Sequence, residues 1–427
     1  MLSDVQIKAY TDILKEELLV AMGCTEPIAI AYAASILRMT LGRQPEKLRA
    51  GLSGNIIKNV KSVIVPATGG LHGIEAAISA GIIAARPQLQ LEVLTALRPE
   101  DQPQIADFAA RCQFELTEME TIHPFDLELT GTYGTDTVTV RITGNHTNVK
   151  KVTKNGEDLT AAFLCDVMEQ ENTRTDRSVL NVKDIIAFAE QTPLEELKPL
   201  LERQIKMNTE IAEEGIRNAY GACIGQVLYA GGKASLRDKA RAMAAAGSDA
   251  RMSGCEMPVS ILSGSGNQGI TASVPVVVYA KELGKTHEEL LRALIVSDLI
   301  TIHLKTGIGC LSAYCGAISA GCGCGCGICY LMGGRYYEVA HTLVNSVAIL
   351  SGTICDGAKP SCAAKIAAAV DAGLMGYYMY TTGSHQFVDG EGIIKKGVEN
   401  TIDNVGRLAR EGMRRTDEEI LHIMVGQ

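Results

Sequence analysis

The sequence contains no tryptophan, and aromatic residues make up only 4% of its 427 positions. Large aromatic side chains therefore fill little of any core, and helices packed through Ala, Gly, Leu and Ile suit this shortage. Long Pro, Ser and Gln tracts are also missing, while 46% of the residues are hydrophobic and 21% are charged. This composition favours a folded globular protein over a disordered one, and the length allows two domains.

The chain has no run of five or more basic residues, and its formal net charge is −9. We therefore expect no binding to nucleic acid through phosphate neutralisation. The first twenty residues, "MLSDVQIKAYTDILKEELLV", carry charges throughout and lack the apolar stretch of a signal peptide. We expect a cytoplasmic protein whose partner is a small molecule, and a homo-oligomer is compatible with the sequence.

Charge is absent from 29 consecutive residues, 306–334. That length exceeds what a membrane-spanning helix requires. Nine of the 29 residues are glycine, which keeps the hydrophobicity modest. The stretch therefore favours a buried, tightly packed helical hairpin over a membrane span.

The spacing of apolar residues changes along the chain. Residues 4–21 and 26–41 have helical spacing and are separated by "MGCTEP", in which Thr25 is a good N-cap. Residues 44–165 combine helical segments with alternating strands such as "LQLEVLTAL" and a hairpin at "TYGTD". From residue 183 onward the pattern is helical, with breaks at "AAAGSDARMSGC", "SGSGNQGI", "CDGAKPSC" and "YTTGSHQ".

These patterns predict an α+β fold that is predominantly helical, with a large helical domain and a smaller inserted α/β sheet subdomain. Residues 1–43 are expected to supply helices that pack with the helical domain. Residues 44–165 are expected to form the α/β subdomain, and residues 166–427 the helical domain.

The chain has thirteen cysteines, eight of them between Cys310 and Cys362. In a reducing compartment such cysteines are small core residues, metal ligands or reactive thiols rather than disulfides. In "CDGAKPSC", Cys355 ends one helical stretch and Cys362 stands in the first turn of the next. A helix N-terminus favours a thiolate, so the pair could converge on one metal centre; two small core positions are the equal alternative.

The stretch "GCGCGCG" is a poorer set of ligands than its cysteine content indicates. In a helix, Cys322, Cys324 and Cys326 step by about 200° every two residues, so they cannot all face one ion. The spacing also matches no C-x-x-C zinc pattern. We interpret the three as packing residues and consider Cys315, in "AYCGA", the better ligand candidate. The isolated Cys112, Cys165 and Cys223 are interpreted as core residues.

Three further motifs carry polar groups. "GCTEP" places Cys24 just before a helix N-terminus, where the pKa of a thiol falls and a thiolate can act as base, nucleophile or iron ligand; a purely structural role is the alternative. "GSGNQG" (264–269) matches a dinucleotide fingerprint, but "MPVSIL" is a doubtful strand and Pro275 interrupts the helix that should follow. It fits better as a backbone nest for a carboxylate, or as a plain loop. "ATGGLHG" and "GNHTN" combine turns with histidine.

Taken together, the motifs of the sequence resemble those of a known family. The segments "MGCTEPIAIAYAAS", "SGNIIKNV", "ATGGLHGIEAA", "GSGNQGI", "CGAISAG", "ICDGAKPSCAAKI" and "EGII" follow one another as in the UPF0597 family of L-cysteine desulfidases, which is related to the α region of iron-sulfur L-serine dehydratases. The resemblance covers nearly the whole chain. "GCTEP" and "CDGAKPSCA" are specific when they occur together.

The resemblance implies a [4Fe-4S] cluster held by Cys315, Cys355 and Cys362, whose separations of 40 and 7 are those of the family. It implies Cys24 as the reactive group and a pyridoxal-phosphate-independent β-elimination of L-cysteine to sulfide, ammonia and pyruvate. L-serine dehydratase and an iron-sulfur sensor or scaffold without turnover are the alternatives. The substrate contacts expected from the motifs are Thr25, Glu26, His72, His146, Thr147, Asn148, Ser265, Asn267 and Gln268.

Overall fold

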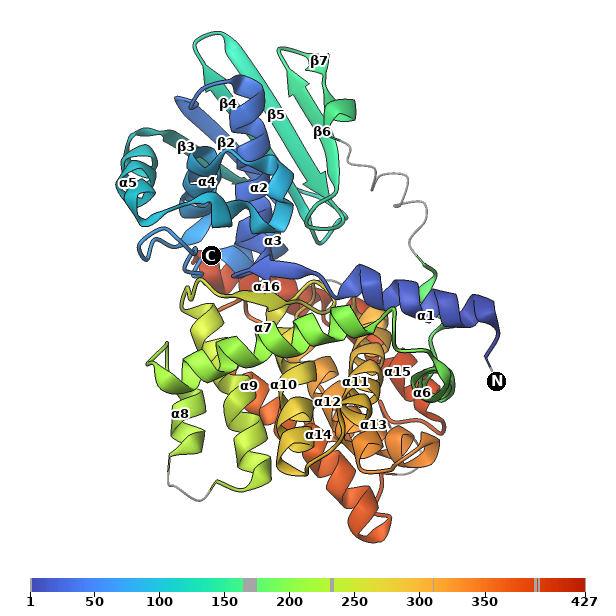
Figure 1. Cartoon of the computed structure of the whole chain (residues 1–427). Coiled ribbons are helices and arrows are strands. Elements are labelled where there is room, and N and C mark those ends of the chain that lie inside the picture. Colours follow the sequence, from blue (N-terminus) through green and yellow to red (C-terminus); the bar gives the residue numbers. More distant parts are fainter. Residues whose placement is uncertain are drawn as a thin grey trace.

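The computed structural model describes residues 2–163, 175–230, 234–309, 311–387, 390 and 392–426. Two lobes are visible, an α/β lobe and a larger helical lobe (Figure 1). The expected class, α+β and predominantly helical, is confirmed. The expected boundary at residue 165 lies outside the described residues.

The α/β lobe is built on a six-stranded sheet in the order β3-β2-β4-β5-β6-β7. Neighbouring strands are antiparallel except β2 and β3, which are parallel. The expected hairpin at "TYGTD" is confirmed: Tyr133 pairs with Asp136, and Gly134 takes a positive φ of 56° that glycine adopts without strain. The strands are β2 (Lys47–Leu52), β3 (Gln113–Glu118), β4 (Asp126–Tyr133), β5 (Asp136–Thr143), β6 (Val149–Lys154) and β7 (Glu157–Asp158).

Helices pack on this sheet and shape its core. The central one, α2, is buried almost all round and shares a core with Leu127 of β4 and Val140 of β5. The expectation that both N-terminal helices pack with the helical domain is therefore wrong for α2, because periodicity shows a buried helix without showing which core buries it. The helices of this lobe are α2 (Thr25–Leu41), α3 (Gly54–Val60), α4 (Gly73–Ala84), η1 (Pro87–Ala96), η2 (Pro99–Asp101), α5 (Gln102–Arg111) and η3 (Thr160–Ala162).

Two local expectations for the first hundred residues are also wrong. Helix α1 (Asp4–Glu17) ends before residue 21, and Val20–Met22 instead form β1, which pairs with β8 (Pro258–Ser260) of the helical lobe. "LQLEVLTAL" is not a strand but lies in the 3₁₀ segment η1. There Leu91 and Leu94 are buried three residues apart, which is the period of a 3₁₀ turn.

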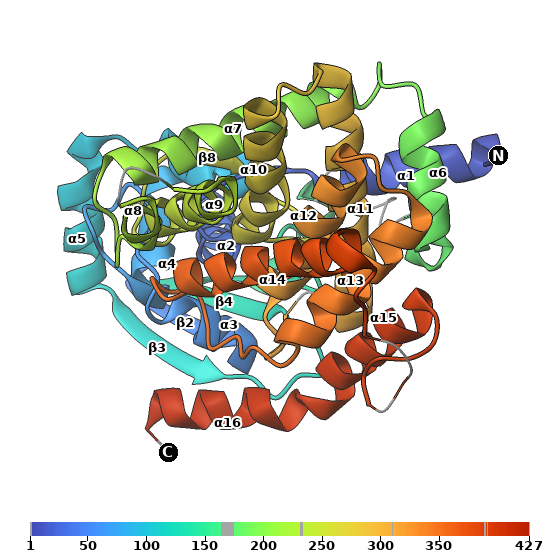
Figure 2. The ribbon, with the colours of Figure 1, turned by 90° about the horizontal axis from the view of Figure 1, so that it is seen from below.

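The helical lobe gathers its long helices into one bundle beneath the sheet, with α16 along one edge (Figure 2). No helix in the described ranges is both long and apolar enough to span a bilayer. The helices are η5 (Arg177–Val179), α6 (Val182–Gln191), α7 (Lys198–Arg217), α8 (Ile224–Tyr229), α9 (Leu236–Met252), α10 (Gly266–Glu282), α11 (His287–Ile308), α12 (Gly316–Leu331), α13 (Tyr336–Leu350), α14 (Cys362–Gly383), α15 (Val398–Arg407), η6 (Leu408–Gly412) and α16 (Arg414–Val425).

Packing in this bundle overrides two breaks read from the sequence. Helix α9 continues through "AAAGSDARM" to Met252, and α10 continues through Pro275. Both helices are packed against several neighbours in the bundle. Tertiary contacts of this kind supply most of the stability of a helix in a protein.

The glycines of α12 explain how this helix fits at the centre of the bundle. A Cβ at Gly321 or Gly325 would lie about 2.4–2.5 Å from backbone oxygens of α14, and a Cβ at Gly323 would lie 2.1 Å from Thr301 Oγ1 of α11. Residues two apart on a helix face nearly opposite directions. The alternating glycines therefore give α12 two small faces, one for α11 and one for α14.

Candidate active site

A cavity of about 110 Å³ lies where the two lobes meet. The α/β lobe contributes Cys24, Glu26 and Asn59 to its wall. The helical lobe contributes the rest, including Arg251, Ser265, Asn267, Gln268, Lys305, Cys315, Cys355 and Cys362. Most of the residues singled out in the sequence are thus brought together at one place.

Four helices begin at this cavity. Cys24 is the N-cap of α2, Ser265 the N-cap of α10 and Cys315 the N-cap of α12, while Cys362 is the first residue of α14. Helix N-termini present unpaired N–H groups and a partial positive charge. The cavity is therefore suited to anions and to thiolates.

Cys315, Cys355 and Cys362 form one side of the cavity. The Cys315 thiol donates a hydrogen bond to Cys355, and this bond, with burial, raises the pKa of Cys315 well above its ordinary value. The same bond, supported by Lys58, lowers the pKa of Cys355 below its ordinary value. Burial raises the pKa of Cys362. The Cys315–Cys355 pair is therefore the part of this wall that most readily loses a proton.

The backbone holds the first two cysteines side by side. Tyr314 and Ile354 form an antiparallel bridge, in which the Cys355 N–H donates to the Ala313 carbonyl at 2.6 Å and the Cys315 N–H donates to the Thr353 carbonyl at 3.0 Å. Cys355 thus lies beyond the end of α13, in this bridge rather than at a helix terminus as expected from the sequence.

A lysine pair fixes the turn between Cys355 and Cys362. Asp356 accepts hydrogen bonds from Lys359 at 2.6 Å and Lys365 at 2.5 Å. Burial alone would raise the pKa of Asp356, but these two lysines lower it to about 2. The carboxylate therefore stays charged and ties the turn to the first part of α14.

The C-terminal helix supports the same region from outside the cavity. Asp417 of α16 forms an ion pair with the buried Lys58 of α3, and it also accepts a hydrogen bond from the Ala313 N–H at 2.8 Å. One carboxylate thus connects the α/β lobe to the segment that leads to Cys315.

Cys24 faces the thiols from the α/β lobe. It packs with Cys362 and Met252. Burial raises the pKa of Cys24 to about 12, and the Arg251 guanidinium partly offsets that rise through its charge and a hydrogen bond. Burial thus outweighs the fall in the pKa of Cys24 that the helix start favours. The N-cap is Cys24 itself rather than Thr25.

The segment "GSGNQG" closes another wall. Ser265, Asn267 and Gln268 line the cavity, and Gln268 is almost fully buried. Thr25 is buried beside them, where its hydroxyl donates to the Gly264 carbonyl at 2.8 Å. Thr25 therefore positions this loop rather than lining the cavity.

The remaining sequence candidates lie outside the cavity. His72 is exposed at the N-cap of α4. Thr147 and Asn148 make hydrogen bonds within their own turn, to Asn145 and Thr143. His146 packs on Phe125, with ring centroids 4.6 Å apart, and lies beside Gly264. Of these four residues, His146 alone adjoins a loop of the cavity.

Known proteins are similar to this chain over nearly its whole length. A family model described as the serine dehydratase alpha chain matches residues 88–422. A UPF0597 protein of Desulfitobacterium hafniense is 52% identical over 424 residues, which cover 99% of this chain and 98% of that protein. UPF0597 proteins of Lachnoclostridium phytofermentans and Finegoldia magna are 46% and 45% identical, covering 98% of this chain in both cases and 99% and 100% of those proteins.

The chain belongs to the UPF0597 family. Its family is thereby related to the alpha chain of serine dehydratase, and the model match spans the loop of Cys355 and Cys362 as well as Cys315. Cys24 lies before the matched residues, within the segment that the UPF0597 relatives cover.

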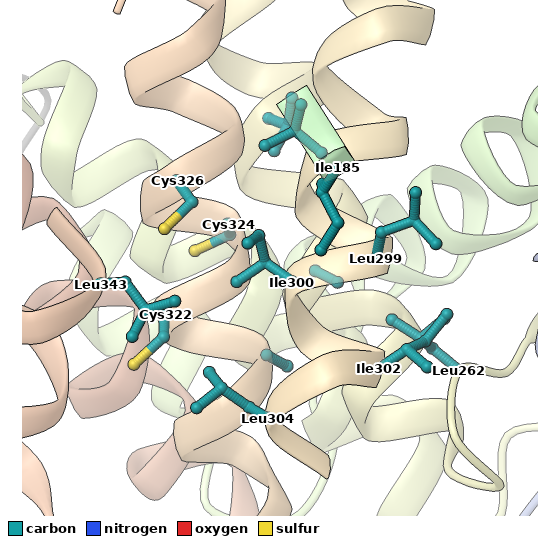
Figure 3. Packing of buried hydrophobic residues seen from close by; sticks show 14 of the residues in the cluster. Ile185, Leu262, Leu299, Ile300, Ile302, Leu304, Cys322, Cys324, Cys326 and Leu343 are labelled. Atoms are coloured by element: carbon teal, nitrogen blue, oxygen red, sulfur yellow. The ribbon is translucent and has the colours of Figure 1, made fainter. Parts of the chain in front are cut away.

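In this UPF0597 chain the cysteines of "GCGCGCG" are placed away from the cavity. Cys322, Cys324 and Cys326 are buried in the middle of α12, among apolar side chains of the helical core. Figure 3 shows them in the same apolar cluster as Ile300 and Leu343. Burial raises the pKa of Cys322 to about 12 and those of the other two above their ordinary values. Of the other cysteines, Cys112 is buried, Cys223 is partly exposed, and Cys165 lies outside the described residues.

Several cavity residues of the UPF0597 chain were not singled out from its sequence. They are Asn59, Arg251 and Lys305, all of which are almost fully buried. Arg251 and Lys305 each lie near the C-terminal end of a helix, among small or apolar neighbours. A basic residue in such a position is the signal that could have drawn attention to them.

Proposed function

We propose that the protein is a lyase that eliminates sulfide from L-cysteine, giving sulfide, ammonia and pyruvate with the uptake of one water. The observation that carries this proposal is the meeting of Cys315, Cys355 and Cys362 with Cys24 in one cavity. The membership in a family related to serine dehydratase supports elimination as the reaction type. The small volume of the cavity suits an amino acid with a short side chain.

The donor set of the cavity fits an iron-sulfur cluster. In the described part of the chain, no three His, Cys, Asp or Glu side chains are grouped as a single metal ion would need. Cluster irons are instead each held by one thiolate, and so three cysteines on one wall are a suitable set. Lys58 and Lys305 favour thiolate at Cys355. We propose that Cys315, Cys355 and Cys362 hold a [4Fe-4S] cluster, which when bound supplies an iron with an open position as a Lewis acid for the leaving thiolate.

The other cavity residues would bind the amino acid and move its proton. Glu26 is held by Asn59 Nδ2 at 3.0 Å, which leaves its carboxylate placed for the substrate ammonium. Cys24 would take the α-proton; a buried thiol is a poor base, and Arg251 with the start of α2 are the groups that favour its thiolate. N–H groups at the start of α10 would stabilise the charge that develops on the substrate.

The test is an anaerobic assay of the purified protein with L-cysteine and with L-serine. Sulfide and pyruvate from L-cysteine at a higher kcat/KM than pyruvate from L-serine are the expected result. The family match to serine dehydratase makes L-serine dehydration the second candidate, and the reverse preference would establish it. Iron-loaded protein that turns over neither amino acid would overturn the proposal and favour a sensor or scaffold.

A further inference from the structure

Arg251 is a buried cation with capacity for a ligand. It lies at the end of α9 on the cavity wall and is only 3% exposed. Its Nη2 donates to the Gly23 carbonyl at 2.9 Å, while its Nε has no hydrogen-bond partner in the described ranges. No ion pair joins it to a carboxylate in the same ranges. A buried charge without a counter-charge is costly, and so a ligand anion would stabilise this one.

A second element places the guanidinium at an anion-binding position. A Cβ at Gly266 would lie 2.3 Å from Arg251 Nε and 2.8 Å from its Cζ. The guanidinium is therefore packed directly on the first residue of α10, where the helix presents free N–H groups. Gly266 is required at this position because any side chain would displace the arginine.

The cavity is lined by both a negatively and a positively charged side chain, which suits a zwitterionic ligand. Glu26 supplies a carboxylate from the start of α2, and Arg251 supplies the cation from the end of α9. A planar guanidinium can hold a carboxylate through two parallel hydrogen bonds, which an ammonium group cannot do. A free α-amino acid is the ligand class that matches both groups.

We propose that Arg251 binds the α-carboxylate of the amino-acid substrate, together with the N-terminus of α10. The proposal rests on the proposed function for the identity of the substrate, but binding through Arg251 requires no elimination. A purely structural role of Arg251, through its contacts with Gly23 and Cys24, is the alternative. That role predicts no difference in affinity between an amino acid and its amide.

The test compares L-alanine with L-alaninamide as ligands of the anaerobic, iron-loaded protein, measured by calorimetry. Neither compound has a leaving group, so the result is independent of turnover. We expect the amide to bind roughly 10- to 100-fold more weakly, the range for losing hydrogen bonds to a charged group. Equal binding of the two compounds, or binding of neither, would overturn the proposal. Absence of elimination with the preference intact would overturn the proposed function alone.

Variants then assign the preference to Arg251. Arg251→Met should keep its iron, bind L-alanine roughly 10- to 100-fold more weakly, and no longer distinguish it from the amide. Arg251→Lys keeps the charge and should retain part of the preference. It is the variant to measure if Arg251→Met does not fold. Arg241→Met is the matched control, because Arg241 lies on the same helix and pairs with Asp238 and Asp371 outside the cavity. Loss of iron from a folded Arg251 variant, or an unchanged preference, would overturn the assignment.

Discussion

Two groups of cysteines have different surroundings, although all their members except Cys24 lie between residues 315 and 362. The cavity cysteines are Cys24, Cys315, Cys355 and Cys362, and the core cysteines are Cys322, Cys324 and Cys326. Three of the cavity cysteines stand at helix N-termini, and Cys355 lies in a loop near two buried lysines. The core cysteines stand in the middle of α12 among apolar side chains. Position relative to helix ends and cations, rather than density in the sequence, separates the two groups.

The two surroundings also differ in the partners that they offer to charged side chains. Around the cavity, two charged side chains have charged partners: the buried Lys58 pairs with Asp417, and the partly exposed Asp356 pairs with two lysines. In the core, Asp298 of α11 is fully buried and accepts its hydrogen bond from the neutral side chain of Gln204. The cavity can therefore hold ions, whereas the core favours neutral forms.

The largest effect is expected from the three proposed ligands. Cys315→Ser, Cys355→Ser and Cys362→Ser, made singly, should each abolish the brown, oxygen-labile chromophore and all turnover, because a hydroxyl replaces a thiolate that binds iron. Iron content and the visible spectrum after anaerobic reconstitution are the measurements. Cys324→Ser is the control and should keep its iron. Full iron in all three ligand variants would show that the two groups of cysteines do not differ as proposed.

A smaller effect is expected from Cys24. Cys24→Ala should retain its iron and bind L-cysteine, while elimination falls on the order of a hundredfold or more, the range for removing a positioned base. Exchange of the substrate α-proton with solvent, followed by NMR, should be lost with it. Turnover near the parent rate would exclude Cys24 as the base. His146, which adjoins the loop of Gly264, would then be tested before the exposed His72.

The sequence could predict those parts of the site that local signals mark. Glycine and proline around Cys24 and Cys362 indicate helix starts, and both residues lie at helix starts in the structure. Arg251 could not be placed in the same way, because it reaches the cavity only through the meeting of two lobes that are distant in sequence. The assignment of α2 to the wrong core has the same cause, since periodicity carries no long-range information.

The preference of the core for neutral side chains can be tested at Asp298. Burial raises the pKa of this carboxyl to about 7, so it is protonated in the folded protein at a pH where it is ionised in the unfolded chain. Stability is therefore lost as the pH rises from about 4 to about 7, by on the order of 4 kcal/mol at 1.36 kcal/mol per pKa unit. Asp298→Asn should remove this loss and be more stable than the parent at pH 8.

The asparagine should preserve the local hydrogen bonds. Gln204 Nε2 donates to Asp298 Oδ1 at 2.9 Å, and Asp298 Oδ2 and Gln204 Oε1 have no other partner in the described ranges. The introduced side-chain amide could donate to Gln204 Oε1, as a protonated carboxyl would. Denaturant unfolding of both proteins at pH 5 and pH 8 is the measurement. The same pH dependence in parent and variant would contradict the assignment of the loss to Asp298.

The smallest effect is expected from the core cysteines themselves. A Cys322→Ala, Cys324→Ala, Cys326→Ala triple variant should keep its iron and most of its activity. Its free energy of unfolding should fall by roughly 1 kcal/mol per site, because each change removes one buried sulfur and leaves a small cavity. Iron analysis, turnover and denaturant unfolding measure the three quantities.

A glycine from the same stretch makes the matched control. Gly323→Ala adds only one methyl group, but its Cβ would lie 2.1 Å from Thr301 Oγ1 and 2.5 Å from the Ser297 carbonyl oxygen. Helices α11 and α12 would have to separate, so this single change should destabilise the protein at least as much as the loss of three sulfurs. That order would show that "GCGCGCG" is constrained by its glycines. Loss of iron from a folded triple variant would instead show that a core cysteine is a ligand.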